Sequence, residues 1–134
     1  MAEESPLFFK QLLSGVDIAK SDSSAHQMAN FIYLIGDKNT RECVIVDPAW
    51  DIDGILEVIE AEEMKLKGSL VTHYHPDHVG GSIFGMNIKG LAELMAKSPS
   101  PVYVNKHEAA GLKQVTGLSD SDLRLTDSEE VLSI

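Results

Sequence analysis

The segment from Thr72 to Gly81, THYHPDHVGG, constrains the fold more than any other part of this 134-residue chain. It places three of the five histidines and one aspartate within six consecutive positions. Neutral imidazoles and carboxylates are the nitrogen and oxygen ligands that bind zinc and the neighbouring transition metals. Leu70 and Val71 predict a short buried strand just before the segment. We therefore expect this histidine loop, residues 72–81, at the carboxyl end of a strand, where open α/β sheets keep their sites.

The spacing within the histidine loop predicts two adjacent ligand positions. His73 and His75 are two residues apart, so they point the same way in an extended segment and can reach one metal ion together. Pro76 then turns the chain, which lets Asp77 and His78 face a second position on the other side of the loop.

A solvated loop is the alternative interpretation, with hydrogen bonds satisfying the histidine ring nitrogens. Two histidines alone, two residues apart, would favour it. Here four ligand-type residues are followed by Gly80 and Gly81, which permit close backbone approach and the tight start of a helix. This combination favours a metal site.

The histidine loop resembles the H-x-H-x-D-H signature of the metallo-β-lactamase superfamily, and the longer string TxHxHxDHxGG is most similar to its hydroxyacylglutathione hydrolase (glyoxalase II) branch. Residues 30–35 (NFIYLI) and 44–48 (VIVDP) resemble the second and third strands of the family, and residues 101–104 (PVYV) a later strand. The resemblance implies an α/β fold of the αββα-sandwich type. Residues 1–134 would form a single, incomplete domain that represents only its amino-terminal portion.

The resemblance also implies roles for individual residues. His73 and His75 would bind metal 1, and Asp77 and His78 would bind metal 2. Zinc is the expected metal, two ions per complete domain, with iron or manganese as alternatives. A metal-bound hydroxide, oriented by Asp77, would attack the carbonyl of a small thioester or ester substrate. Asp47 would support the histidine loop from behind, although it could instead simply end its strand in a turn.

The family completes its two sites with further histidines and a bridging aspartate that have no match in this chain. We therefore expect the isolated chain to bind metal weakly and to be a poor catalyst. His107 is not expected to be a ligand, and His26, grouped with a polar loop over residues 20–25, is expected to be a surface or supporting residue. An iron-dependent oxidoreductase similar to persulfide dioxygenases and a non-catalytic metal-binding fragment stay open as alternatives.

Composition restricts the partners. A net charge of −10 argues against a nucleic-acid partner, because phosphate neutralisation needs clustered lysine and arginine. The amino terminus, residues 1–5, is acidic where a secretory signal is basic, and no apolar run reaches the length of a membrane span. A cytoplasmic protein without a membrane partner is expected, and the oligomeric state is open. The single cysteine, Cys43, excludes an internal disulfide and is expected to be a small buried apolar residue.

Periodicity predicts the remaining elements. Strands are expected at residues 7–13, at an edge of the sheet, and at 30–35, 43–46 and 102–104, with the first strands antiparallel and a hairpin loop at 36–41. Asp51 or Asp53 is expected to cap a helix that runs to about Glu63. A helical pattern covers residues 83–97, interrupted or delayed by its glycines, and a short helix is expected from His107 to Thr116. Residues 123–134 resemble the segment that leads into a later strand of the family.

Overall fold

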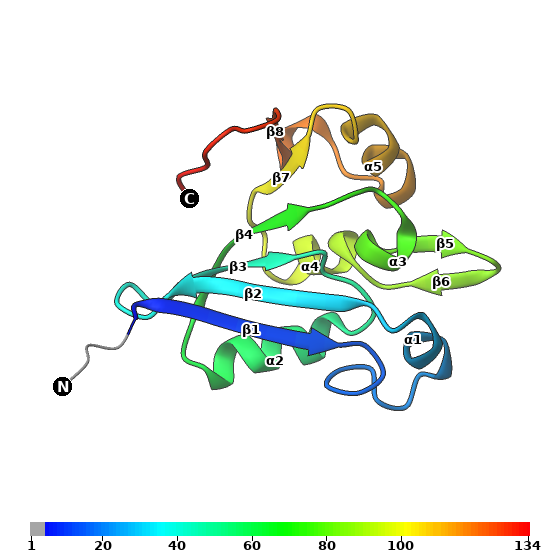
Figure 1. Cartoon of the computed structure of the whole chain (residues 1–134). Coiled ribbons are helices and arrows are strands. Elements are labelled where there is room, and N and C mark those ends of the chain that lie inside the picture. Colours follow the sequence, from blue (N-terminus) through cyan, green and yellow to red (C-terminus); the bar gives the residue numbers. More distant parts are fainter. Residues whose placement is uncertain (1–4) are drawn as a thin grey trace.

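The computed structural model describes residues 5–134 and contains a six-stranded sheet, a two-stranded hairpin and short helices (Figure 1). The acidic residues 1–4 lie outside the described part. The strands are β1 Leu7–Leu13, β2 Phe31–Asp37, β3 Glu42–Val46, β4 Lys65–Val71, β5 Gly81–Ile83, β6 Met86–Ile88, β7 Val102–Asn105 and β8 Leu123–Thr126. The helices are α1 Ser23–Met28, α2 Ile52–Ala61, α3 Pro76–Val79, α4 Leu91–Lys97, α5 Ala109–Thr116 and the 3-10 turn η1 Asp120–Asp122.

The large sheet is mixed and has the order β1-β2-β3-β4-β7-β8. Its first three strands are antiparallel, and β3, β4, β7 and β8 run parallel to one another. The predicted α/β class is confirmed, as are the strands expected at residues 7–13, 30–35, 43–46 and 102–104 and the edge position of β1. Because β3 and β4 are parallel neighbours, their carboxyl ends lie at the same edge of the sheet.

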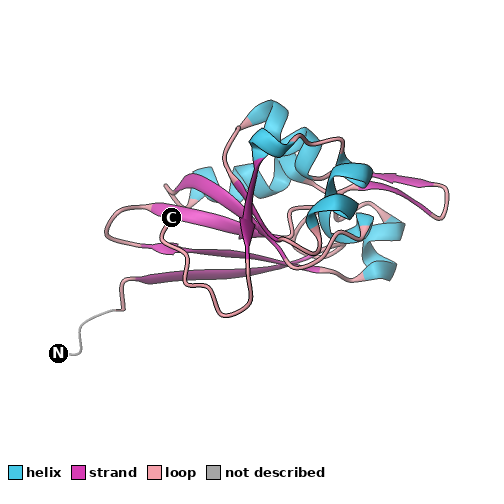
Figure 2. Cartoon of the chain, turned by 90° about the horizontal axis from the view of Figure 1, so that it is seen from above, coloured by secondary structure: helices cyan, strands magenta, loops and turns pink. Residues whose placement is uncertain are grey.

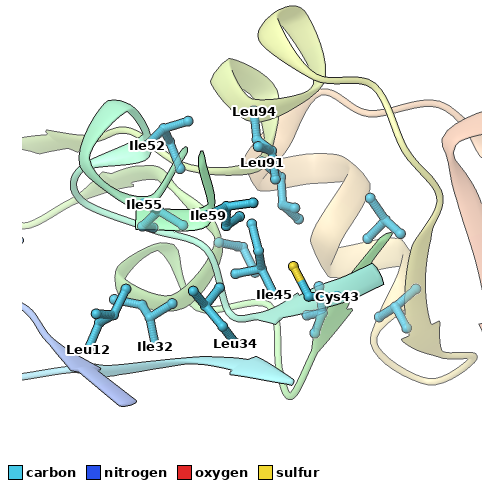
Figure 3. Packing of buried hydrophobic residues seen from close by; sticks show 14 of the residues in the cluster. Leu12, Ile32, Leu34, Cys43, Ile45, Ile52, Ile55, Ile59, Leu91 and Leu94 are labelled. Carbon is cyan, nitrogen blue, oxygen red and sulfur yellow. The ribbon is translucent and has the colours of Figure 1, made fainter. Parts of the chain in front are cut away.

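One face of the sheet carries the hydrophobic core (Figure 3). Alternate residues of the strands point towards α2 and α4 and are almost fully buried, as expected for a half-buried sheet. The residues labelled in the close-up are Leu12, Ile32, Leu34, Cys43, Ile45, Ile52, Ile55, Ile59, Leu91 and Leu94. The predicted cap of α2 is Asp51, whose carboxylate accepts a hydrogen bond from the Gly54 amide at 2.9 Å. Cys43 is buried as predicted.

The opposite face of β1 and β2, here called the open face (Leu7, Phe9, Phe31, Tyr33 and Ile35), carries apolar side chains that are only partly covered. Phe9 and Phe31 are 57% and 43% exposed. The ring of Tyr33 stacks between them, with centroid distances of 5.6 Å and 6.3 Å. Most helices lie on the other side of the sheet (Figure 2). The open face is the surface that a second layer would cover in the sandwich expected from the sequence.

The helix expected over residues 83–97 is wrong in its first half. Residues 81–88 form the β5–β6 hairpin, and α4 begins only at Leu91. Phe84 and Gly85 form the turn with φ angles of 50° and 76°, the left-handed pair of a two-residue hairpin turn. The glycine pair at the end of the histidine loop likewise does not start a helix, because Gly80 ends α3 and Gly81 begins β5.

The loop expected over residues 20–25 is also wrong, because residues 23–28 form α1 and include His26. The carboxylate of Asp22 accepts hydrogen bonds from the amides of Ser24 and Ala25, which caps the helix. Among the helices of residues 5–134, none combines the length and the apolar character that crossing a bilayer requires.

Candidate metal centre

The histidine loop begins at the carboxyl end of β4, as predicted. Asp47 holds the matching position after the parallel neighbour β3, so it lies beside Thr72. The Asp47 amide donates to the carbonyl of Leu70 at 2.9 Å, which continues the sheet to this edge. Strand geometry therefore places an aspartate from one strand behind the loop that follows the next strand.

Asp47 is 5% exposed, and its carboxylate accepts three hydrogen bonds from the histidine loop. Its Oδ1 accepts from the Thr72 amide at 2.8 Å, and its Oδ2 accepts from the Thr72 hydroxyl at 2.5 Å. Oδ2 also lies 3.0 Å from Nδ1 of His78. This arrangement suits the supporting role expected of Asp47, because the carboxylate contacts the loop at its first residue, Thr72, and again at His78.

These contacts fix which ring nitrogens are free. The Thr72 hydroxyl has one proton and donates it to Asp47, so at His73 it accepts from Nδ1, 2.9 Å away. Nδ1 of His78 donates to Asp47. In both neutral rings the unprotonated nitrogen is therefore Nε2, the form that a metal ligand needs.

The electrostatics of His78 follow from the same contacts. The hydrogen bond to Asp47 raises the pKa of His78 above its ordinary value, and the charges of Asp47 and Asp77 act in the same direction, while burial opposes them. The carboxylates thus make this imidazole a stronger base, and protons compete with a metal ion for it.

The four residues predicted as ligands lie together. The ring centroid of His73 lies 4.7 Å from that of His75 and 4.1 Å from that of His78. Oδ2 of Asp77 lies 3.4 Å from Nε2 of His78. The most compact group joins His73 and His78 to Asp47, with one ligand-type atom of each within 4.8 Å of the others. His75 is exposed.

The helical turn α3 orients two of these side chains. Pro76 occupies its first position, where a missing N–H costs nothing and the fixed φ favours a helix. Asp77 and His78 follow within the same turn, and Gly80 ends it with a φ of 90°. A Cβ on Gly80 would lie 2.7 Å from the backbone of Gly90, so the close approach predicted for this glycine pair is confirmed.

Sequence reasoning missed two side chains that contact the histidine loop. The Asn30 amide donates to Oδ2 of Asp77 at 3.1 Å, and the carboxylate of Glu108 accepts from the Tyr74 amide at 3.2 Å. Asn30 begins a segment that resembles a strand of the family, but its spacing does not assign it to the site, and Glu108 belongs to no motif. His26 and His107 are exposed, and neither belongs to the compact group.

The donor set fits a transition metal. Imidazole nitrogens together with a carboxylate suit zinc, and also iron or manganese, whereas a site for calcium or magnesium would be made of oxygens. The two Nε2 atoms of His73 and His78 are oriented by hydrogen bonds, which is how proteins prepare histidine ligands.

Comparison with known proteins decides the family. The sequence profile of the metallo-beta-lactamase superfamily matches residues 27–120, more than half of the chain. The chain belongs to the metallo-β-lactamase superfamily. A solved metallo-beta-lactamase from Staphylococcus aureus shares the fold, with a TM-score of 0.61 and 19% identity over 97% of this chain and 32% of that one. The predicted fold family is confirmed.

Curated relatives include hydrolases. A hydroxyacylglutathione hydrolase of Klebsiella pneumoniae is 34% identical over 93 residues, which are 68% of this chain and 33% of that protein. A probable polyketide biosynthesis zinc-dependent hydrolase of Bacillus velezensis is 40% identical over 55 residues, which are 40% of this chain and 24% of that protein. The matched part thus spans a third or less of the length of either relative.

Proposed function

We propose that this chain carries metal-binding residues of a hydrolase that cleaves a small thioester or ester, as in hydroxyacylglutathione hydrolases. One observation carries the proposal: the hydrogen bonds of Asp47 and Thr72 leave Nε2 of His73 and of His78 unprotonated, and Nε2 of His78 lies 3.4 Å from Oδ2 of Asp77. The names of the Klebsiella and Bacillus relatives, a hydroxyacylglutathione hydrolase and a zinc-dependent hydrolase, support both the reaction class and the metal.

His73 and His75 would hold one zinc ion, and Asp77 and His78 would hold a second. Bound there, zinc supplies a Lewis acid that acidifies water and polarises a carbonyl group. Asp47 keeps a proton on Nδ1 of His78, which leaves Nε2 unprotonated as a ligand. Oδ2 of Asp77 accepts a hydrogen bond from the side-chain amide of Asn30. We therefore assign Oδ1 of Asp77 to orienting the attacking water. A cytoplasmic location stays a prediction from the sequence.

The test measures zinc uptake by the purified chain and thioester hydrolysis by the longest natural form of the protein. His75→Ala should remove both the weak zinc binding expected of the chain and the hydrolysis by the longer form. His26→Ala is the matched control, because His26 is exposed on α1 outside the cluster, and it should leave both unchanged. Zinc binding that survives His75→Ala would contradict the ligand assignment. A single bound iron with oxygen uptake would instead move the assignment to an oxidoreductase similar to persulfide dioxygenases.

A further inference from the structure

The side chain of Asn30 joins the only tryptophan of the chain to the histidine loop. The indole Nε1–H of Trp50 donates to Oδ1 of Asn30 at 3.1 Å. The Nδ2 of the same amide donates to Oδ2 of Asp77 at 3.1 Å and lies 3.3 Å from Nε2 of His78. One carboxamide thus contacts a buried indole on one side and two expected ligand atoms on the other.

The orientation of this amide is fixed by chemistry. An indole nitrogen can only donate, so the atom of Asn30 that faces Trp50 is the carbonyl oxygen. The NH₂ group must then face Asp77, whose carboxylate can only accept. Within residues 5–134, this is the one hydrogen bond that the Asp77 carboxylate accepts. Without the amide, the Asp77 side chain would be free to turn away from His78.

The backbone of Asn30 is held as firmly as its side chain. Ser14 is 1% exposed, and its backbone N–H donates to the backbone carbonyl of Asn30 at 2.9 Å. Its hydroxyl accepts from the backbone N–H of Asn30 at 2.9 Å. The same hydroxyl donates to the carbonyl of Ala25 at 2.9 Å. Asn30 therefore has little freedom to move, because the end of β1 and helix α1 both fix it.

Trp50 is fixed in turn. It is 8% exposed and packs with Ala25, Ala49 and Ile88 in a small second core. Its amide donates to the carbonyl of Lys89 at 2.9 Å. The indole can therefore serve as a rigid support for the amide.

We propose that Asn30 is a positioning residue of the metal centre, which aims Asp77 and His78 and is itself held by Trp50. The inference rests on the proposed function, in which Asp77 and His78 bind metal. It also makes the Trp50 indole a built-in reporter, because any change at Asp77 reaches the indole through a single side chain.

The first test needs no metal and follows the Nε1–H resonance of Trp50 by NMR. Asn30→Ala should move this resonance upfield and speed its exchange with water, because the acceptor is lost. Asp77→Ala should also shift it, since the amide loses its partner. His75→Ala is the control and should leave it in place, because His75 is exposed and, within residues 5–134, the Nδ2 of Asn30 contacts Asp77 and His78 instead. An indole resonance that responds to His75→Ala but not to Asp77→Ala would overturn the inference.

The second test titrates zinc into each variant against a chromophoric chelator. Asn30→Ala should weaken binding about 10–100-fold, the usual effect of removing a group that orients a ligand. Asn39→Ala, in an exposed turn, should bind like the wild type. Trp50→Phe keeps the NH₂ group that faces Asp77, so its zinc affinity should fall less than that of Asn30→Ala. If Asn30→Ala does not fold, Trp50→Phe takes its place in the titration.

The two tests separate the proposals. Wild-type affinity in a folded Asn30→Ala variant would overturn the positioning role and leave the proposed function standing. If the wild-type chain takes up no zinc, the proposed function fails. The indole resonances of Asp77→Ala and His75→Ala still decide whether Asn30 couples Trp50 to Asp77.

Discussion

Replacing Asp47 by asparagine should both destabilise the fold and weaken metal binding. Asparagine keeps the size of the side chain and tolerates the left-handed backbone at this position, where φ is 54°. Its oxygen can still accept from the Thr72 amide. Its NH₂ group, however, faces the hydroxyl of Thr72 and Nδ1 of His78, which both donate to the native carboxylate.

The size of the effect follows from these two contacts. Thr72 is exposed, so its hydroxyl can turn to water or accept from the new amide at little cost. The bond from His78 to a buried carboxylate is lost, and a hydrogen bond to a charged group contributes about 1.5–3 kcal/mol. An NH₂ group opposite Nδ1 also favours the imidazole tautomer with its proton on Nε2. This proton blocks the ligand atom, so we expect zinc affinity to fall about 10–100-fold.

Urea unfolding followed by far-ultraviolet circular dichroism gives the stability, and zinc competition gives the affinity. Asp17→Asn is the matched control: Asp17 is exposed and accepts one amide hydrogen bond, from Leu13 at 2.8 Å, which an asparagine oxygen can also accept. It should change stability by less than about 0.5 kcal/mol. An Asp47→Asn variant that matches this control in stability and the wild type in zinc affinity would refute the role assigned to Asp47.

Four further outcomes are expected. The stability gap between wild type and Asp47→Asn should narrow as pH rises, in urea unfolding of the metal-free chain at several pH values. The pKa of His78 is raised in the folded chain, so its ion pair with Asp47 stabilises the wild type fully below the unfolded pKa of about 6.5. This stabilisation is lost as the pH rises through the folded pKa. Burial raises the pKa of Cys43 to about 11, so a thiol reagent at pH 8 should react only after urea unfolds the chain. Leu34→Ala, at a fully buried position, should cost about 2–5 kcal/mol in urea unfolding, and a loss below 1 kcal/mol would contradict this packing. Phe9→Ser should reduce binding of a hydrophobic dye to the open face, whereas Phe84→Ser, in the β5–β6 turn, should have little effect on it.

The elements that could be predicted from sequence are those with a strong local signal. Residues 43–46 are an unbroken run of small and β-branched apolar residues, residues 7–13 are rich in leucine and phenylalanine, and both are strands. The histidine loop could be located because Leu70 and Val71 precede a dense set of ligand-type residues. The β5–β6 hairpin was missed because its apolar residues also fit a helical period, and the left-handed turn at Phe84 and Gly85 decides between the two structures.

The supports of the site could be predicted only in part, since they are brought together by the tertiary fold. The role of Asp47 could be predicted because the resemblance to the family implies a supporting aspartate at this position. Asn30 precedes β2, and its side chain reaches α3 across 47 positions of sequence, a contact that no local spacing encodes. Its partner Trp50 gives no polar signal at all, because an indole in an apolar cluster looks like an ordinary core residue.

One short loop explains why both supports exist. Asp47 and Trp50 are its two ends, and both have left-handed backbones, with φ of 54° and 76°. Such conformations in non-glycine residues cost of order 1–3 kcal/mol each and persist only where the surrounding structure imposes them. Here the Asp47 amide is anchored to Leu70 and the Trp50 amide to Lys89. The two turns send the carboxylate towards Nδ1 of one histidine and the indole towards Asn30, so a single strained connection orients both sides of the proposed metal centre.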